Sequence, residues 1–394
     1  MSFDFRRTSL MLDILMPITI VLIFIPPCMM HYAPSFMSYA FLIQKVIFLF
    51  CFFYFFKHIK DKYSYFWILM AYLLWLIAVT WIRGNSIGDI GSYLNIFSLC
   101  VIAMYCIKHN PQKFTGYVAF IFTLWMFLNS ALWKDGGMYL NSDGQMCYVL
   151  GTKTSITYYQ ITACSFIGLY DCCLKQRGKY KAKFLYAVLF ASTLYWNIRQ
   201  PISTSIMCLA VFFILLIIKN ADKKIIDKIF NIGFTAMLVL NIGVVFFNAQ
   251  MLFANFITGV LHESTELNAR TFIWKVVLEK IAANPLLGYG LNSDTFFAVG
   301  GGVAAINQST HNNLLYLLFC SGIIGTVYFY FICYYAMHET KRYTKFNRMI
   351  CIVLICFGLM WITEQLKGFE MIFLCLISYI CCTREVRSES LLMR

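Results

Sequence analysis

The chain has 394 residues, of which 60% are hydrophobic and 13% charged, and its formal net charge is +14 at pH 7. A soluble globular domain is about 45–50% apolar and about 25% charged, so this composition excludes a soluble domain and predicts an integral membrane protein. The excess of lysine and arginine is expected to flank membrane helices on the cytoplasmic side, and no nucleic-acid partner is expected from it.

The predicted elements are about twelve membrane-spanning helices, because a helix needs about 20 apolar residues to cross the hydrocarbon core. The first is interpreted as a retained helix rather than a signal peptide, because no small-residue cleavage pattern follows its apolar run. We expect an all-α polytopic bundle with spans at 11–31, 36–56, 65–82, 90–107, 115–133, 154–174, 184–198, 201–218, 229–247, 311–337, 349–364 and 368–382.

The chain is expected to fall into three regions. Residues 1–247 hold the first nine helices, residues 248–310 form a large extracytoplasmic loop with an amphipathic helix, and residues 311–394 hold the last three helices and a cytoplasmic tail. The 16 cysteines lie almost entirely in apolar runs. Cysteine behaves there as a small hydrophobic residue, so neither a disulfide framework nor a cysteine metal site is expected.

Positive charge is unevenly divided between alternate connectors. With the amino terminus placed inside, most of the 32 lysines and arginines fall in inside connectors. This asymmetry predicts that both termini are cytoplasmic. The same alternation places the loop at 248–310, the loop at 134–153 and the hinge Asn197-Ile198-Arg199-Gln200-Pro201 on the outer face.

The loop at 248–310 carries a predicted helix at 268–283, which ends before Pro285 because the residue preceding a proline disfavours helix. Arg270 lies on the first turn of this helix. The helix is expected to lie in the membrane interface, because its apolar residues form one stripe. That stripe consists of Ile273, Trp274, Val277, Leu278 and Ile281.

Three separate segments bring chemically useful side chains to the outer face: Arg199 from the hinge, Arg270 from the loop helix, and His311 from the start of the next span. A guanidinium near a membrane is costly unless it is paired, so such residues are functional candidates. Arginine binds phosphate oxygens in bidentate fashion, and a neutral histidine can take a proton from a hydroxyl. The set therefore fits a site that binds a diphosphate leaving group and deprotonates an acceptor hydroxyl.

Further candidates surround these three residues. Tyr289 is a candidate contact of the diphosphate or an interfacial aromatic residue, and Asn312 is a candidate substrate contact that orients His311 or a helix cap. Glu364 lies near the outer end of its helix, where it can assist His311 or pair with Lys367. No Asp-x-Asp pair suited to a divalent cation occurs on the outer face, so the arginines are expected to neutralise the leaving group without a metal.

Four motifs follow one another in the region 266–326: Arg270-x-x-x-Trp274, Asn284-Pro285-Leu286-Leu287-Gly288-Tyr289-Gly290, His311-Asn312-Asn313 and Gly322-Ile323-Ile324-Gly325. These motifs resemble the O-antigen ligase and Wzy polymerase superfamily. The resemblance covers residues 266–326, whereas over the first 180 residues it is limited to helix number and hydropathy. The hinge carries Ile198-Arg199 where the family tends to show Ser-Arg.

The resemblance implies a bacterial inner-membrane enzyme that uses glycans carried on undecaprenyl diphosphate and acts on the periplasmic face without a metal or other cofactor. It also implies that Arg199 and Arg270 hold the donor diphosphate and that His311 activates the acceptor hydroxyl. The expected partners are the lipid-linked donor, a glycan or lipid A-core acceptor and membrane lipids, and a chain-length regulator is left open.

Three functions are weighed. The favoured one is an O-antigen or capsular polysaccharide polymerase, which joins lipid-linked repeat units. The second is an O-antigen ligase, which transfers the finished polymer to lipid A-core. The third, from another class, is a flippase for lipid-linked oligosaccharide. A flippase is expected to carry ionisable residues at mid-membrane depth, whereas the notable residues here cluster at the outer ends of helices.

Overall fold

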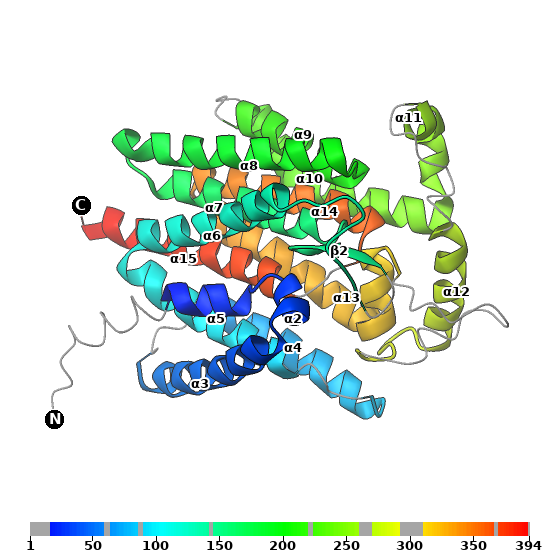
Figure 1. The fold of residues 1–394 in the computed structure, drawn as a ribbon, viewed down its shortest axis with the longest axis horizontal. Helices are drawn as coiled ribbons and strands as arrows, with labels where there is room; N and C mark the ends of the chain where they lie inside the picture. Colours follow the sequence, from blue (N-terminus) through cyan, green and yellow to red (C-terminus); the bar gives the residue numbers. More distant parts are fainter. Residues whose placement is uncertain are drawn as a thin grey trace.

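Helices make up almost all of the described structure (Figure 1). The computed structural model describes residues 16–58, 64–85, 90–141, 145–219, 224–259, 270–291, 310–365 and 369–392. Its longer helices are α3 (Pro34–His58), α4 (Ser64–Ile82), α5 (Ile90–His109), α6 (Pro111–Ala131), α7 (Ile156–Cys173), α8 (Lys179–Arg199), α9 (Ser203–Ile218), α10 (Lys224–Phe247), α12 (Arg270–Ala283), α13 (Asn313–Thr340), α14 (Thr344–Thr363) and α15 (Glu370–Leu392). The predicted helical class is confirmed.

Six of the described helices are long and apolar enough to cross a membrane, so the chain is a multi-pass membrane protein. The helices α7, α8 and α15 pack into the same bundle without meeting that measure of length and apolarity. The count of about twelve spans therefore stays a prediction. The six spans are Pro34–Phe55, Ser64–Ile82, Pro111–Ala131, Asp227–Phe247, Asn313–Thr340 and Thr344–Thr363.

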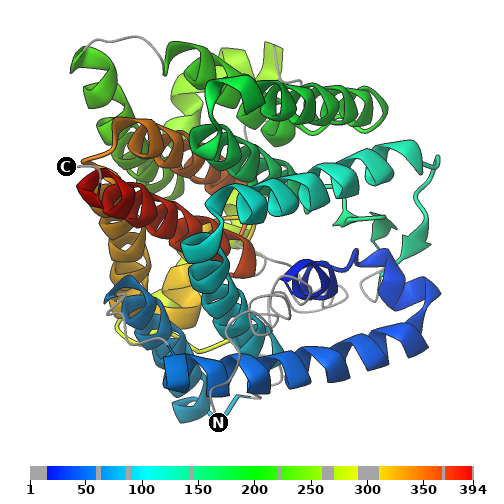
Figure 2. The same cartoon turned by 90° about the vertical axis from the view of Figure 1, so that its left-hand side faces the viewer.

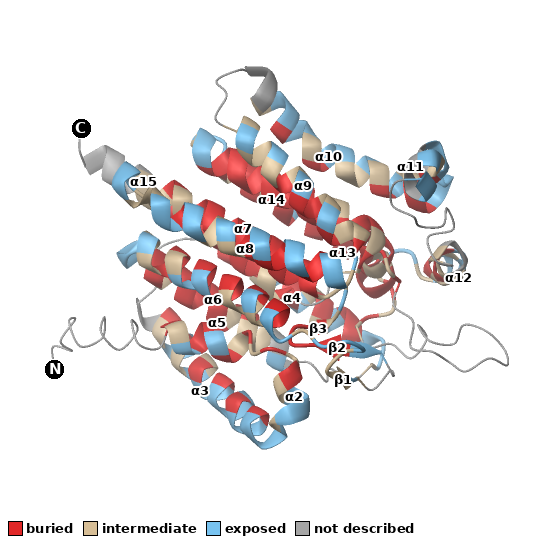
Figure 3. Cartoon of the chain, turned by 45° about the horizontal axis from the view of Figure 1, so that its top comes forward, coloured by how far each residue is buried: buried red, intermediate tan, exposed pale blue. Residues whose placement is uncertain are grey.

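The helix α14 lies at the centre of the bundle. In α14 (Thr344–Thr363), 89% of the most apolar stretch of 18 residues is buried inside the protein. The corresponding share is 28% for the spans in α3 and α10. Figure 3 shows the same contrast, with α14 almost wholly buried and α3 exposed along one side. The residues that follow α14 are therefore attached to the most buried of the six described spans.

The bundle has two chemically different ends. At one end, which we call the basic end, Lys219 pairs with Asp171 and Arg348 pairs with Asp227. At the other, which we call the loop end, lie the small sheet and α12, which runs across the ends of the bundle helices at the right of Figure 1. Figure 2 shows the bundle from the left-hand side of Figure 1, with α3 running across the bottom of the view.

Two local predictions were wrong. The single helix expected at 11–31 is broken, because Pro26 and Pro27 separate helical residues 16–23 from α2 (Cys28–Tyr32). The loop at 134–153, for which no strand was expected, forms a three-stranded antiparallel sheet of β1 (Tyr139–Leu140), β2 (Met146–Tyr148) and β3 (Gly151–Thr152).

The long loop between α10 and α13 is partly helical. After Phe247 come a 3₁₀ turn at Ala249–Phe253, the helix α11 (Ala254–Gly259) and α12. The helix expected at 268–283 is observed over Arg270–Ala283, since residues 260–269 lie outside the described part of the chain, as do 292–309. None of the 16 cysteines takes part in a disulfide bond, and all but Cys173 are buried.

Candidate active site at the loop end

The C-terminal end of α14 is the point at which separate segments of the chain meet. The helix ends at Thr363, and Glu364 follows in an extended conformation. Each residue from Ile362 to Gln365 forms a hydrogen bond with another segment of the chain. The partners are Asn312 at Ile362, Thr204 at Thr363, Arg270 at Glu364, and Thr310 and Tyr158 at Gln365.

Arg270 forms the ion pair of this region. Its Nη2 donates to Oε1 of Glu364 at 3.3 Å, and Glu364 is only 4% exposed. Trp274 lies one turn further along the same face of α12, and its Nε1 donates to the carbonyl of Thr310 at 2.9 Å. The helix α12 thus docks through the face that carries Arg270 and Trp274, and its first turns lie beside the segment that holds His311.

The apolar stripe of α12 packs on protein. Trp274, Val277 and Ile281 are buried in one cluster with Leu315 and Phe319 of α13. Burial of a large apolar side chain contributes roughly 1.5–3 kcal/mol, so this contact is sufficient to hold α12 across the end of the bundle. The sequence predicts that α12 lies in the membrane interface. The structure adds that its apolar stripe packs against the helix bundle.

His311 has a left-handed backbone conformation, with a φ of 47°. That conformation costs a residue with a side chain roughly 1–2 kcal/mol and persists only where the surroundings enforce it. Thr310 supplies that enforcement, because its amide donates to Oε1 of Gln365 at 3.0 Å and its hydroxyl donates to the carbonyl of Asn312 at 2.8 Å. His311 as a whole is partly exposed, its Nδ1 is buried, and its side chain leaves a fixed piece of backbone at the start of α13.

Asn312 is a fully buried helix cap, with 0% of its surface exposed. Its Oδ1 accepts from the amide of Leu315 at 3.0 Å, while its Nδ2 donates to Oδ1 of Asn241 at 2.8 Å and to the carbonyl of Ile362 at 3.0 Å. Both ends of the side-chain amide are thus engaged with protein. These contacts favour a positioning role beside His311, and a direct contact with substrate stays a prediction.

Arg199 is the last residue of α8, and it lies at the loop end in a different environment from Arg270. Its guanidinium lies over the rings of Trp133 and Tyr195, with centroid distances of 5.2 and 5.6 Å. The structure ties Arg270 and the segment that carries His311 to the end of α14, whereas Arg199 is exposed at the same end of the bundle.

The hinge after Arg199 is nevertheless tied to the same centre. Asn197 accepts from the amide of Ile202 at 3.3 Å and donates to the hydroxyl of Ser205 at 3.0 Å, which closes the turn between α8 and α9. The hydroxyls of Thr204 and Thr363 share a hydrogen bond of 2.9 Å. Through Thr204 the hinge region is thus tied to Thr363, the residue that precedes Glu364.

Tyr289 is held by packing. Its ring stacks on Phe319 with centroids 4.8 Å apart, its hydroxyl donates to the carbonyl of Lys280 at 3.0 Å, and Arg83 lies over the ring at 5.9 Å. These contacts explain the tyrosine by its role in joining α12 to α13. A contact with a diphosphate stays a prediction.

The segment that carries Tyr289 is inserted into a break in α13. Gly322 has a φ of 65° inside that helix, and the amides of Tyr289 and Gly290 donate to the carbonyls that the break exposes, those of Phe319 and Cys320, at 2.7 and 2.9 Å. A side chain on Gly288 would stand 2.5 Å from the Phe319 carbonyl. Gly288, Gly290 and Gly322 thus belong to one interlocked unit that fixes the first part of α13.

The electrostatics of the region are dominated by arginine. No group of three or more His, Cys, Asp or Glu side chains is arranged to hold a metal ion in the described ranges. In the nearby sheet, burial and then the charge of Asp135 raise the pKa of Tyr148, which therefore stays neutral at neutral pH. Its phenol does not offset the charge of Arg199.

Sequence reasoning missed part of this arrangement. Glu364 was a secondary candidate expected to assist His311 or to pair with Lys367, and the structure pairs it with Arg270. Lys367 lies outside the described residues. Thr363 and Gln365, which tie the hinge and the His311 segment to α14, were not singled out. Their signal in the sequence is a polar run directly after an apolar helix.

The chain is therefore a multi-pass membrane protein whose candidate site, with Arg270 and His311, lies at one end of its helix bundle. Residues 176–330 match the protein-family model described as O-antigen ligase. That match runs from α8 into α13, whose last turns lie beyond it, and it includes Arg199, Arg270 and His311. It confirms the resemblance to the O-antigen ligase and Wzy polymerase superfamily over this part of the chain. A search of curated proteins found no match to the chain.

Proposed function

We propose that the chain is a membrane glycosyltransferase that joins undecaprenyl-diphosphate-linked repeat units into an O-antigen or capsular polysaccharide. The observation that carries the proposal is the joint fixing of two segments by α14: Glu364 binds Arg270 at 3.3 Å, and the adjacent Gln365 accepts from the Thr310 amide at 3.0 Å, next to His311. Because Glu364 and Gln365 are consecutive, the two segments that carry Arg270 and His311 are anchored at one place, which suits a single reaction centre.

The proposed reaction is a displacement at the anomeric carbon of the donor. The hydroxyl oxygen of the acceptor forms the new bond to that carbon as the bond from the carbon to the diphosphate oxygen breaks. The hydroxyl proton passes to His311, and undecaprenyl diphosphate leaves with both bonding electrons. Arg270 and Arg199 neutralise the leaving group, so the reaction needs no metal or cofactor.

Arg270 has donors available for this role. A guanidinium carries five N–H groups in a planar fork, and the contact to Glu364 involves Nη2. The side chain of Arg270 is 19% exposed, so the rest of the fork can face a ligand while Glu364 holds it in place. Arg199 and Tyr289 remain proposed contacts of the donor at the periphery, and Asn312 is proposed to orient His311.

The second candidate is ligation of finished polymer to lipid A-core, which the description of the matching family favours. The two reactions share a donor and differ in acceptor. Purified protein supplied with undecaprenyl-diphosphate-linked repeat units alone should form longer lipid-linked chains if it is a polymerase. Product that forms only after lipid A-core is added would establish the ligase instead.

A flippase is less well supported. Among the described residues, the ion pairs Lys219–Asp171, Arg348–Asp227 and Arg384–Glu339 lie at the basic end, and Arg270–Glu364 lies at the loop end. Charged residues that mark a translocation path are expected at membrane depth. A polymerase also agrees with the proposed location, a bacterial inner membrane with both termini cytoplasmic and the loop end facing the periplasm.

A further inference from the structure

Two aromatic rings hold the guanidinium of Arg199 at the loop end. Its central carbon lies 5.2 Å from the ring centroid of Trp133 and 5.6 Å from that of Tyr195. Both distances fall within the roughly 6 Å over which a cation is attracted to an aromatic face. Among the residues that the structure describes, the Arg199 side chain forms no hydrogen bond and no ion pair. The two rings are therefore the contacts that fix the guanidinium.

The rings belong to two neighbouring helices. Tyr195 precedes Arg199 by four residues, so both side chains lie on one face of α8. Trp133 follows the end of α6, and the hydroxyl of Ser130 donates to the carbonyl of Ser192 on α8 at 2.7 Å in the protein interior. This hydrogen bond joins the two helices three residues before each ring, and it thereby sets the position of Trp133 beside Arg199.

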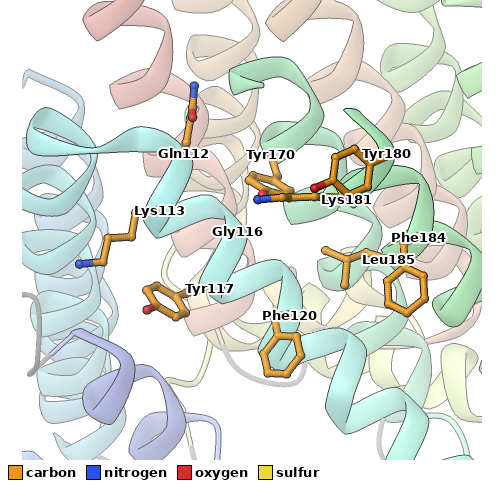
Figure 4. Close-up of a pocket in the computed structure, with 10 residues that line it drawn as sticks. All are labelled: Gln112, Lys113, Gly116, Tyr117, Phe120, Tyr170, Tyr180, Lys181, Phe184 and Leu185. Carbon is orange, nitrogen blue, oxygen red and sulfur yellow. The ribbon is translucent and has the colours of Figure 1, made fainter. Parts of the chain in front are cut away.

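The same two helices are farther apart at the basic end. A groove of about 560 Å³ lies there between the first turns of α6 and the first turns of α8. Figure 4 shows side chains of α6, such as Tyr117, on one side of the groove and side chains of α8, such as Phe184, on the other. The contact between Trp133 and Arg199 thus belongs to the end at which a hydrogen bond joins the two helices.

The indole of Trp133 is not placed by a hydrogen bond. Its Nε1 is buried and has no hydrogen-bond partner within the described part of the chain. A buried polar group without a partner destabilises a fold, and phenylalanine would pack at this position without that cost. Indole is, however, the aromatic ring that attracts a cation most strongly. The contact with Arg199 therefore accounts for tryptophan at this position.

The ring contacts leave the hydrogen-bonding groups of Arg199 available. A guanidinium has five N–H donors in one plane, and Arg199 is exposed at the end of α8. The partial negative charge at the C-terminal end of a helix also favours a cation there. A charged, oriented guanidinium with free donors suits an anion that offers several oxygens, such as a diphosphate.

We propose that Trp133 and Tyr195 are positioning residues of the donor site, which hold Arg199 in the orientation that receives the diphosphate. The inference rests on the proposed function, in which Arg199 binds the lipid-linked donor. The two rings act through Arg199 and do not bind the phosphates themselves. Each ring is expected to contribute about two- to fivefold to the affinity for the diphosphate.

The test measures the affinity of the purified full chain for farnesyl diphosphate, with farnesol as the probe that lacks the diphosphate. We expect Trp133→Leu to weaken binding of farnesyl diphosphate about fivefold, and Trp133→Phe, which keeps a ring, to weaken it by about twofold or less. Tyr195→Leu should weaken it at least about twofold, and the fold should tolerate this change because Tyr195 is 44% exposed. Farnesol should bind equally to all of these proteins.

Trp81→Leu is the matched control. Trp81 is 72% exposed near the loop end of α4, and it is not one of the two rings over which Arg199 lies. Its replacement removes an exposed tryptophan from the same end of the bundle, and we expect the affinity for farnesyl diphosphate to stay unchanged. A loss as large as that in Trp133→Leu would show a general effect of surface aromatic residues and would overturn the proposal.

A double-mutant cycle separates positioning from direct contact. If Trp133 acts through Arg199, Trp133→Leu should weaken binding by less than about 1.5-fold in protein that already carries Arg199→Gln. A full loss in that background, or an equal loss of farnesol, would mean that the indole contacts the ligand or supports the fold, and it would overturn the proposal. Wild-type protein that binds farnesyl diphosphate no better than farnesol would overturn it as well.

The binding assay and the transfer assay fail independently. Wild-type protein that binds farnesyl diphosphate with the expected dependence on Trp133, but joins no lipid-linked repeat units, would support the positioning role and contradict the proposed function. Protein that joins repeat units with the same KM for the donor in Trp133→Leu as in the wild type would leave the proposed function intact and overturn this inference.

Discussion

Arg270 and Glu364 lie 94 positions apart in the chain and form an ion pair in which Nη2 donates to Oε1 at 3.3 Å. The carboxylate is almost completely buried, while the guanidinium keeps part of its surface exposed. A buried charge is stable only when it is paired, so Glu364 depends on Arg270 and Arg270 is fixed by Glu364. The pair thus holds a cation at the edge of the bundle in one orientation.

The first prediction concerns Glu364. In Glu364→Gln the side chain keeps its shape and still accepts a hydrogen bond, so we expect glycan transfer to fall less than tenfold. In Glu364→Ala the guanidinium loses its partner, and loss of a buried charge partner costs about 2–5 kcal/mol, so we expect a fall of at least thirtyfold. Initial rates with lipid-linked donor check both, and wild-type activity in the alanine variant would refute the positioning role.

The second prediction concerns Arg270 itself. Lysine at this position cannot bind Glu364 and a phosphate in the same planar fork, so Arg270→Lys should lower kcat/KM for the donor about tenfold or more. Lys275→Gln on the exposed side of α12 serves as the control and should leave the rate unchanged. If Arg270→Lys matched the wild type, Arg270 would be a surface anchor of α12.

The third prediction uses the backbone of His311. Asparagine tolerates a φ near 47° better than most residues, so His311→Asn keeps the local fold while it removes the base. General-base catalysis contributes about 10²–10⁴ in rate, so polymer formation should fall by at least a hundredfold. Membrane insertion and thermal stability of the variant, measured in parallel, should stay close to the wild type. Normal chain lengths in this variant would remove His311 from the mechanism.

The fourth prediction concerns the break in α13. Gly322→Ala would place a Cβ against the backbone of Leu286, and this collision cannot be relieved by a side-chain rotation. Gly84→Ala is a matched control, because Gly84 has a φ of 69° but open space around it and should lose only about 1–2 kcal/mol. We expect Gly322→Ala to be recovered mostly as aggregate in gel filtration, whereas Gly84→Ala remains monodisperse. Equal behaviour of the two variants would argue against the interlock.

Much of the fold is predictable from the sequence, because apolar runs of bilayer length identify helices without reference to their partners. The helix that carries Arg270 and the helix start next to His311 are both found from local signals, a proline stop and the edge of an apolar run. The broken first helix shows the limit of this approach, since an apolar run does not reveal that Pro26 and Pro27 divide it.

The pairing of Arg270 with Glu364 is not predictable in the same way. Lys367 is only three residues from Glu364 in the sequence, whereas Arg270 comes near through the path of α12 across the bundle end. Asn312 and Tyr289 likewise lie in motifs that the sequence identifies. Only the tertiary contacts show that Asn312 is a buried helix cap and that the ring of Tyr289 packs on Phe319.

The central claim is that Arg270 and His311 form one metal-independent centre for glycosyl transfer. It is tested most directly by measuring the release of undecaprenyl diphosphate from lipid-linked repeat units by purified protein in the presence of EDTA. We predict release with chain extension by the wild type, and a rate at least a hundredfold lower for His311→Asn. Release that stops in EDTA, or that proceeds equally in His311→Asn, would contradict the account.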